Sequence, residues 1–187
     1  MITAIIFDFF GVFRTDTYNA WLLKNNLERT GVYAEASILS DQGKISSDEF
    51  YRRISEATGR IVTPMEVNET AVLNADMVKF ARQLKRNYQT SLLSNAPDNL
   101  VRQLLDEYDI NDIFDDVFIS GEIGLIKPHA DSFQHALKVM NVPANQALFI
   151  DDNALNVQSA IELGIQSVVF TSVDQLKKDL ESMEIKF

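Results

Sequence analysis

The sequence contains no cysteine among its 187 residues, which excludes disulfides, thiol nucleophiles and thiolate metal ligands. Basic residues are also in the minority, with 17 lysines and arginines against 27 aspartates and glutamates and a net charge of −10. A surface of this charge repels nucleic acid and anionic membranes, and no local basic run offsets it. We therefore expect neither nucleic acid nor a membrane among the partners.

Long hydrophobic runs are missing as well. No apolar segment approaches the length of a membrane span, and the apolar run at the N-terminus lacks the basic region that opens a signal peptide. Hydrophobic residues still make up 46% of the chain, and 12 of them are phenylalanine, which argues against disorder. We expect a soluble, cytoplasmic protein with one domain, or one domain carrying a modest insertion.

The first strand of the fold is predicted at Ile2–Phe7, a nearly unbroken apolar run rich in branched residues. Such a run is typical of a strand buried on both faces of a parallel sheet. Asp8 ends the run, at the strand tip where open α/β sheets place their ligands, and Gly11 allows a tight turn. Taken alone, Asp8 is more simply interpreted as a turn cap, because aspartate often follows strands.

Residues 15–77 show a helical pattern and no convincing strand. Ser46–Glu49 forms a capping box in front of one helix, and Thr63–Glu66 opens another with Pro64 at its first position. Period-two alternation is absent from Tyr33–Leu73, so we predict that no sheet strand lies there. This stretch is predicted to be a small all-helical unit that interrupts an α/β pattern.

From Asp76 onward, strands and helices alternate. Strands are predicted at Thr90–Leu93, Val117–Ile119, Ala147–Ile150 and Ser167–Phe170. Helices are predicted around Val78–Arg86, from about Asp98 to Tyr108, through Phe133 and Met140, up to Leu163, and from Val173 to Met183. The alternation predicts parallel βαβ units with right-handed crossovers, and hence an α/β fold with a three-layer core.

Polar side chains follow two later strands, Ser94-Asn95 after one and Asp151-Asp152 after another, and Lys127 lies between them. Because the carboxyl ends of parallel strands share one edge of the sheet, these groups can meet Asp8 in one crevice. Each has a simpler alternative. Ser94-Asn95 alone is better interpreted as a helix N-cap, and Lys127 as a solvated loop lysine.

Asp151-Asp152 has no such simple alternative. Two adjacent carboxylates after a buried strand repel each other unless a cation lies nearby. These motifs offer oxygen ligands and contain neither cysteine nor histidine. Such a set selects a hard cation, most simply Mg²⁺.

Four segments carry a resemblance to a known family: Asp8-x-x-Gly-Val, Leu-Ser94-Asn95, Lys127-Pro128 and Asp151-Asp152-x-x-x-Asn156. In order and spacing they resemble the four motifs of the haloacid dehalogenase-like hydrolase superfamily, over the whole chain. Within it, the chain resembles the helical-capped subfamily of small sugar-phosphate phosphatases, α-glucose-1-phosphatase among them. The resemblance implies a Rossmann-like core of residues 1–14 and 78–187, with residues 15–77 as the helical cap.

The resemblance also implies roles for the residues that match its motifs. Asp8 would be the nucleophile of an aspartyl-phosphate mechanism, with Lys127 paired to its carboxylate and to the phosphoryl oxygens. Ser94 and the backbone of Asn95 would hold the transferring phosphoryl group. The substrate would be a small phosphorylated metabolite.

A metal site is implied in the same way. Asp8, the Phe10 carbonyl and Asp152 would bind Mg²⁺, with Asp151 assisting or ligating. Positive charge is needed there because a carboxylate cannot approach a phosphate dianion until both are screened.

One position departs from the pattern. Phosphatases of this superfamily usually carry a second aspartate two residues after the nucleophile, as general acid and base, and here that residue is Phe10. An aromatic residue there resembles the true dehalogenases, but those usually lack the paired acids and work without metal. Asp151-Asp152 therefore favours a Mg²⁺-dependent phosphatase, with a 2-haloacid dehalogenase and a non-catalytic phosphate-binding protein as the alternatives.

If the missing carboxylate limits catalysis, the proton for the leaving oxygen must come from water, from the substrate or from the cap. Asp16 is the nearest acid in the sequence, just past the turn. Its simpler role is to cap the helix that begins at Thr17.

Overall fold

The computed structural model describes residues 1–97 and 99–187. Five strands form the sheet: β1 (Ala4–Phe7), β2 (Gln89–Ser94), β3 (Asp116–Ile119), β4 (Ala147–Asp151) and β5 (Gln166–Val169). The helices are α1 (Thr17–Lys24), α2 (Gly31–Asp41), α3 (Ser47–Thr58), α4 (Pro64–Val67), α5 (Ala75–Leu84), α6 (Leu100–Glu107), α7 (Ser120–Ile123), α8 (Ala130–Met140), α9 (Ala154–Glu162) and α10 (Val173–Ser182), with short 3₁₀ turns at Asn111–Ile113 and Ala144–Gln146. Asp98, the predicted start of one helix, lies outside the described residues. Within them, no helix is both long and apolar enough to cross a membrane.

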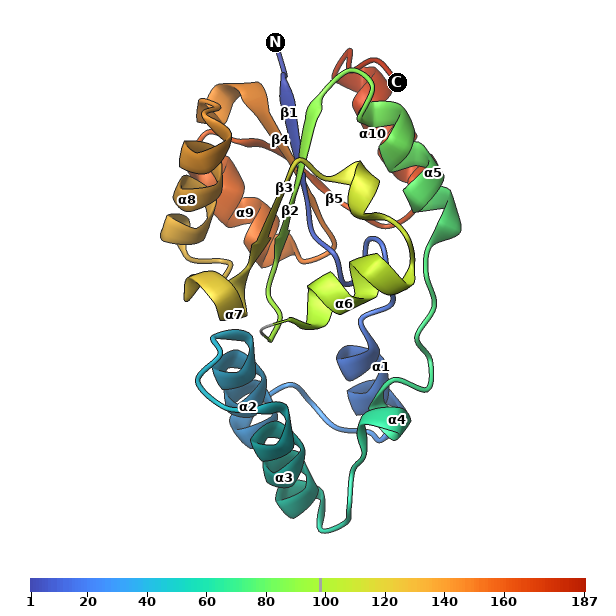
Figure 1. Ribbon diagram of the computed structural model, residues 1–187, viewed down its shortest axis with the longest axis vertical. Helices are drawn as coiled ribbons and strands as arrows, with labels where there is room; N and C mark the ends of the chain where they lie inside the picture. The colour runs from blue at the N-terminus through green and yellow to red at the C-terminus, as the bar shows by residue number, and fades with distance from the viewer. Residues whose placement is uncertain (98) are drawn as a thin grey trace.

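The sheet is parallel throughout, with strand order β3-β2-β1-β4-β5 (Figure 1). β1 is the central strand, where Phe7 pairs with Leu92 of β2 on one side and with Ile150 of β4 on the other. All four residues of β1 are fully buried, as its unbroken apolar pattern predicts. The predicted α/β, Rossmann-like fold is confirmed, and its central strand carries Asp8 at the carboxyl end.

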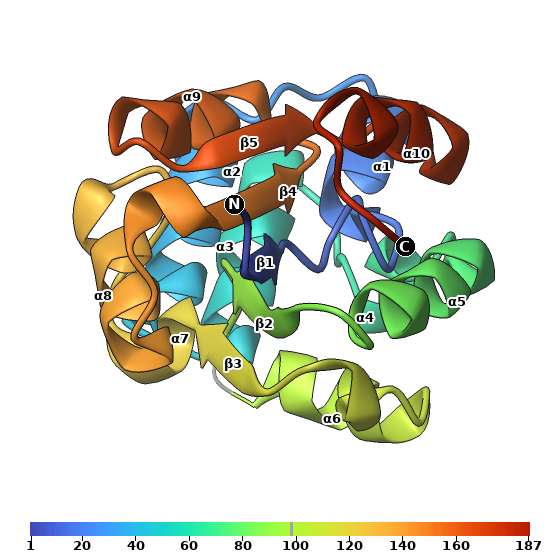
Figure 2. The same cartoon turned by 90° about the horizontal axis from the view of Figure 1, so that it is seen from above.

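Helices cover both faces of the sheet, which makes the core three layers deep (Figure 2). Ile5 and Phe7 point to one face and pack with residues of α5, α6 and α10. Ala4 and Ile6 point to the other and pack with residues of α8 and α9. Successive side chains of a strand alternate between faces, so a strand buried on both sides must be apolar at every position.

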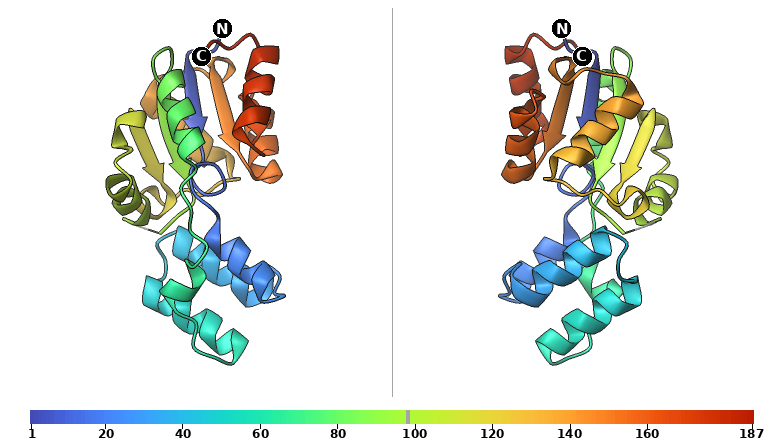
Figure 3. Two further views of the ribbon diagram at one scale, coloured as in Figure 1. Left: turned by 90° about the vertical axis from the view of Figure 1, so that its right-hand side faces the viewer. Right: turned by 90° about the vertical axis from the view of Figure 1, so that its left-hand side faces the viewer.

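Helices α1 to α4 lie beyond the carboxyl ends of the strands, joined to the rest by two chain crossings (Figure 3). They have an apolar cluster of their own, built on Trp21, Leu22, Ala36, Ile54, Val62 and Val67. Residues 33–73, all of which the structure describes, contain no sheet strand, although Leu73 forms a single bridge with Arg14. The division into core and cap at residues 14 and 78 stays a prediction.

Side-chain caps fix where these helices begin. Ser46 accepts a hydrogen bond from the Glu49 N–H, and Thr63 accepts one from the Glu66 N–H, as the sequence predicts. The two glutamate side chains, both among the described residues, do not reach back to the caps; Glu49 accepts from Arg52 and Glu66 from Arg60. Before α5, Asn74 accepts from the Met77 N–H. This cap starts α5 at Ala75 rather than near the predicted Val78, and Met77 already packs with the apolar cluster of the sheet.

The separate apolar cluster of α1 to α4 predicts a clear stability difference between two isoleucines. Ile54 is fully buried in it, whereas Ile61 is 82% exposed. Ile54→Ala should lower the free energy of unfolding by about 2–5 kcal/mol because it leaves a cavity. Ile61→Ala, the same chemical change, should stay within about 0.5 kcal/mol. Urea unfolding measures both, and equal losses would contradict the packing described.

Candidate active site

Asp8 lies at the first position after β1, in the middle of the carboxyl edge of the sheet. Its N–H donates to the Ile150 carbonyl at 2.9 Å, which extends the pairing with β4 by one residue. Its Oδ1 accepts from the Phe9 N–H at 2.7 Å, and the residue is 7% exposed. The chain then turns sharply through Gly11, whose φ of +87° is in the left-handed region that favours glycine. This turn fixes the backbone around the Asp8 carboxylate.

Lys127 is buried between two carboxylates. Its Nζ lies 2.8 Å from Asp8 Oδ1 and 2.7 Å from Asp151 Oδ2. Only 3% of the residue is exposed, so the alternative of a solvated loop lysine is wrong. A lysine this deeply buried is stable as an ion because two opposite charges face it.

The Asn95 side chain holds the Lys127 backbone in place. Asn95 Oδ1 accepts from the Lys127 N–H at 2.9 Å, and Asn95 Nδ2 donates to the Lys127 carbonyl at 2.8 Å. The two bonds tie the loop that carries the lysine to the end of β2. The sequence predicted a backbone contact of Asn95 with the phosphoryl group, or a helix N-cap, and did not predict this clamp.

Asp151 is fully buried at the end of β4, and backbone and side-chain donors surround its carboxylate. The Asn153 N–H donates to Oδ1 at 2.7 Å, and Asn156 Nδ2 lies 3.2 Å from Oδ1 and 3.0 Å from Oδ2. Asn156 was part of the fourth motif but had no predicted role. It lies in the first turn of α9, where its amide reaches back to the strand tip. Its spacing of five residues from Asp151 is the sequence signal that could have predicted this contact.

Asp152 lies beside the Asp8 turn, more exposed than Asp151. Carboxylate oxygens of Asp8, Asp151 and Asp152 lie within 4.8 Å of one another. Three carboxylates against the single ammonium of Lys127 leave two uncompensated negative charges when all are ionised. An oxygen-only donor set with that charge fits a hard divalent cation.

The pKa values of the cluster show the same charge imbalance. Burial, and then the charge of Asp151, raise the pKa of Asp8 to about 8, although Lys127 opposes this rise. Desolvation of its carboxylate, and then Asp151, raise the pKa of Asp152 to about 6. Burial alone would lower the pKa of Lys127, but Asp151 and Asp8 together outweigh it and raise that pKa. The cluster as it stands disfavours full ionisation, which a cation would reverse.

Ser94 ends β2 and is fully buried. Among the described residues, its Oγ is the one buried side-chain nitrogen or oxygen atom without a hydrogen-bond partner. Ser94 does not cap the following helix, so the alternative of an ordinary N-cap is wrong for it. Because an unpaired buried hydroxyl is costly, this atom indicates a ligand position at the edge of the sheet.

Phe10 is in the Asp8 turn, and its ring packs against other aromatic residues. The rings of Phe9 and Phe10 meet edge to face with their centroids 5.1 Å apart, and the Arg14 guanidinium lies 5.8 Å from the Phe10 ring centroid. A phenyl group supplies no proton donor or acceptor. The turn therefore lacks acid–base chemistry at this position.

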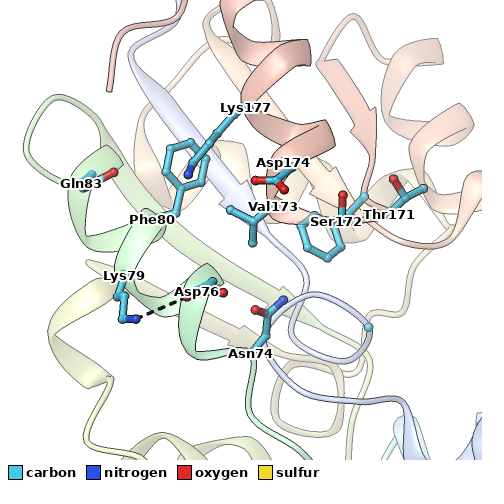
Figure 4. A pocket seen from close by; sticks show the side chains of 12 residues that line it. Asn74, Asp76, Lys79, Phe80, Gln83, Thr171, Ser172, Val173, Asp174 and Lys177 are labelled. Atoms are coloured by element: carbon cyan, nitrogen blue, oxygen red, sulfur yellow. Dashed lines mark hydrogen bonds and ion pairs between the residues drawn. The ribbon is translucent and has the colours of Figure 1, made fainter.

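A groove of about 750 Å³ lies beside the Asp8 turn, between α5 and α10 (Figure 4). It touches the turn only at Gly11. Its two lysines are already engaged, since Lys79 pairs with Asp76 at 3.3 Å and Lys177 Nζ lies 5.3 Å from the Phe80 ring centroid. The candidate site is the carboxylate cluster rather than this groove.

Comparison with known proteins identifies the family. A family model described as a haloacid dehalogenase-like hydrolase matches residues 2–164. The chain therefore belongs to the haloacid dehalogenase-like hydrolases and is a hydrolase, which confirms the resemblance seen in its motifs.

Curated relatives include phosphatases. The chain is 29% identical over 188 residues to a D-ribitol-5-phosphate phosphatase from Bacteroides thetaiotaomicron, with 89% of this chain and 91% of the relative covered. It is 31% identical over 152 residues to drimenol cyclase drtB from Aspergillus calidoustus. That match covers 76% of this chain but spans only 29% of the cyclase.

Solved structures show the same fold. A haloacid dehalogenase family enzyme from Bacteroides thetaiotaomicron superposes with a TM-score of 0.76 at 22% identity, covering 94% of this chain and 98% of that one. The same enzyme in complex with magnesium and inorganic phosphate gives a TM-score of 0.72 at 21% identity, covering 94% and 99%.

The close approach of Gly11 to Asp152 predicts the effect of adding one methyl group. A Cβ on Gly11 would lie 2.2 Å from Asp152 Oδ2, whereas a Cβ on Gly59, also at positive φ, would meet nothing within 4 Å. Gly59→Ala should lower the free energy of unfolding by about 1–2 kcal/mol, because alanine disfavours a positive φ. Gly11→Ala should lower the free energy of unfolding by more than this, because Asp152 must also move. Urea unfolding of the pair compares them, and equal losses would contradict the packing of Asp152 on the turn.

Proposed function

We propose that the chain is a Mg²⁺-dependent phosphatase that hydrolyses a small phosphorylated metabolite through an aspartyl-phosphate on Asp8. The observation that carries this proposal is the cluster of three carboxylates within 4.8 Å, paired with one buried lysine. A dehalogenase that works without metal has no need of the two uncompensated charges. A phosphatase uses them to hold a cation.

In this proposal Mg²⁺ is held by Asp8, Asp152 and the Phe10 carbonyl, with Asp151 assisting or ligating. When bound, the ion supplies positive charge that lets a carboxylate and a phosphate group approach each other. The oxygen donors and the net charge of the cluster fit this ion. The identity of the ion in this chain is part of the proposal.

The protein groups share the remaining work. Asp8 attacks phosphorus, and Lys127 neutralises its carboxylate and the phosphoryl oxygens. The Ser94 hydroxyl and the Asn95 backbone hold the phosphoryl group, which would give Ser94 Oγ the partner that it lacks. Asn95 also positions Lys127 through its side chain.

The comparisons support a phosphoryl substrate. The Bacteroides relative that the chain matches over most of both lengths is a D-ribitol-5-phosphate phosphatase. A structural neighbour was crystallised with magnesium and inorganic phosphate. For this chain we propose the coarser class, a phosphate ester of a small metabolite.

The first test is phosphate release from p-nitrophenyl phosphate, measured with Mg²⁺ and after chelation. We expect release that requires Mg²⁺ and that Asp8→Asn abolishes, since an amide neither attacks phosphorus nor neutralises the cation. Asp76→Asn is the control, because Asp76 is a 78% exposed acid away from the cluster. Full activity of Asp8→Asn would exclude the proposed nucleophile.

The same assay separates the alternatives. Release of halide from a 2-haloacid without metal would favour a dehalogenase. Mg²⁺ binding with no turnover of any phosphate ester would favour a phosphate-binding protein that has lost catalysis.

Asp152 gives a test that does not depend on turnover. Because the pKa of Asp152 is raised from 3.8 to about 6, its ionised form destabilises the metal-free protein as pH rises through this range. At pH 8 without Mg²⁺, Asp152→Asn should therefore be more stable than wild type, and this gain should vanish below about pH 4.

With saturating Mg²⁺ the order should reverse, because only wild type gains the binding free energy of the ion. Urea unfolding with and without Mg²⁺ measures both effects. If Mg²⁺ stabilised both proteins equally, Asp152 would not be a ligand.

A further inference from the structure

The Asp8 turn lacks a proton donor for the leaving group, because Phe10 occupies the position beside the nucleophile. An alkyl oxygen leaves poorly as an alkoxide, and general acid help is worth about 10²- to 10⁴-fold. Asp16, the nearest acid in the sequence, already accepts hydrogen bonds with both carboxylate oxygens. Its Oδ1 accepts from the Asn19 N–H at 3.0 Å and its Oδ2 from Asn19 Nδ2 at 2.6 Å, so it caps α1.

Asp41 is a buried acid that the mechanism above does not use. It is the last residue of α2, and 17% of its side chain is exposed. Arg29 Nη2 lies 4.0 Å from its Oδ2, and the Ser37 hydroxyl helps to stabilise the ionised carboxylate. Burial raises the pKa of Asp41 to about 7, despite Arg29. Near neutral pH it therefore holds a proton that it can give and take back.

The backbone of Asp41 is tied to the phosphate-binding edge of the sheet. Ser120 Oγ, at the start of α7, donates to the Asp41 carbonyl and accepts from the Ala96 N–H at 3.0 Å. Ala96 directly follows Asn95, whose side chain holds Lys127. A short series of hydrogen bonds thus connects the end of α2 to the residues around Asp8.

Two glycines let the segment after α2 and the backbone of α7 approach each other closely. A Cβ on Gly43 would lie 2.9 Å from the Gly121 carbonyl oxygen, tighter than side chains normally allow. Figure 1 shows the end of α2 lying next to α7, below the carboxyl ends of the strands. Asp41 is therefore held at the side of the helical part that faces the sheet.

The charges around Asp41 come from both parts of the molecule. Arg29 and Asp16 face it from the helical part, and Lys127 acts on it from the sheet edge; the Lys127 charge lowers its pKa, and the Asp16 charge raises it. Lys127 is the residue that pairs with Asp8. The Asp41 carboxyl group is therefore near enough to the sheet edge for the charge of Lys127 to act on it.

We propose that Asp41 is the general acid and base of this enzyme, in place of the carboxylate that Phe10 lacks. The inference rests on the proposed function. In the first step a bond forms between Asp8 and phosphorus, the ester P–O bond breaks, and the leaving oxygen takes the Asp41 proton. In the second step the Asp41 carboxylate takes a proton from water as the water oxygen bonds to phosphorus, and the bond between the Asp8 oxygen and phosphorus breaks. Inorganic phosphate leaves, and both aspartates return to their starting state.

The test compares two leaving groups in the presence of Mg²⁺. For glycerol 1-phosphate, Asp41→Asn should lower kcat/KM by about 10²- to 10⁴-fold, because the alkoxide needs the proton. For p-nitrophenyl phosphate, kcat/KM should change little, since this leaving group departs unaided and kcat/KM does not include the second step. Glu35→Gln, an exposed acid on the same helix, should leave both values unchanged.

The pH profile gives a readout that a structural role would not move. In wild type, kcat/KM for glycerol 1-phosphate should fall as pH rises through about 7, where Asp41 loses its proton. Asp41→Asn should remove that limb. A further test uses the wild-type enzyme alone and so does not depend on the folding of a variant. Across alkyl and aryl phosphate esters, its kcat/KM should depend only weakly on the pKa of the leaving group.

The assignment of Asp41 would be overturned if Asp41→Asn lowered kcat/KM equally for both substrates or for neither. A steep dependence of wild-type kcat/KM on the leaving group would also overturn it. These outcomes differ from failure of the proposed function itself. If Asp8→Asn is inactive while Asp41→Asn lowers kcat/KM equally for both substrates, only the role of Asp41 is excluded. If Asp8→Asn stays active, the aspartyl-phosphate mechanism fails first.

Discussion

The placement of one ammonium group between two buried carboxylates is the constraint on which the site depends. Lys127 Nζ lies within 2.8 Å of both Asp8 and Asp151, at the tips of the neighbouring strands β1 and β4. Removing Lys127 would leave both buried carboxylates without compensation, which is costly. The strand pairing, the Asn95 clamp and the Asn156 amide all serve to keep these three groups in place.

This arrangement compensates one negative charge of the cluster and leaves two uncompensated. Lys127 compensates one of three carboxylates, so the cluster still needs positive charge, and the buried Ser94 hydroxyl still needs a partner. In a chain of net charge −10, such a centre favours a divalent cation and repels an anion unless a cation is bound, which is what the proposed function requires.

Much of the fold was predictable because its signals are local. The apolar run of β1 and the regular alternation after Asp76 indicate a parallel sheet, and strand tips of a parallel sheet share an edge. That argument brought Asp8, Lys127 and Asp151-Asp152 to one place, where the structure has them. Their catalytic and metal-binding roles stay predictions.

Other parts of the site were not predictable from sequence, because they depend on contacts between distant segments. The Asn95 side chain clamps a backbone 32 residues away, and no propensity or period records such a bond. Asp41 looks like an ordinary helix end until Ser120 and the Gly43–Gly121 contact place it against the sheet. Asp16 attracted attention because it is near in sequence, yet it caps a helix.

A crystal structure with Mg²⁺ and beryllofluoride would test the central claim most directly. Beryllofluoride mimics a phosphoryl group on a carboxylate. The account predicts an adduct on an oxygen of Asp8, with Ser94 Oγ and Lys127 Nζ in contact with its fluorines and Mg²⁺ between Asp8 and Asp152. An adduct on another residue, or Mg²⁺ bound away from Asp8 and Asp152, would contradict it.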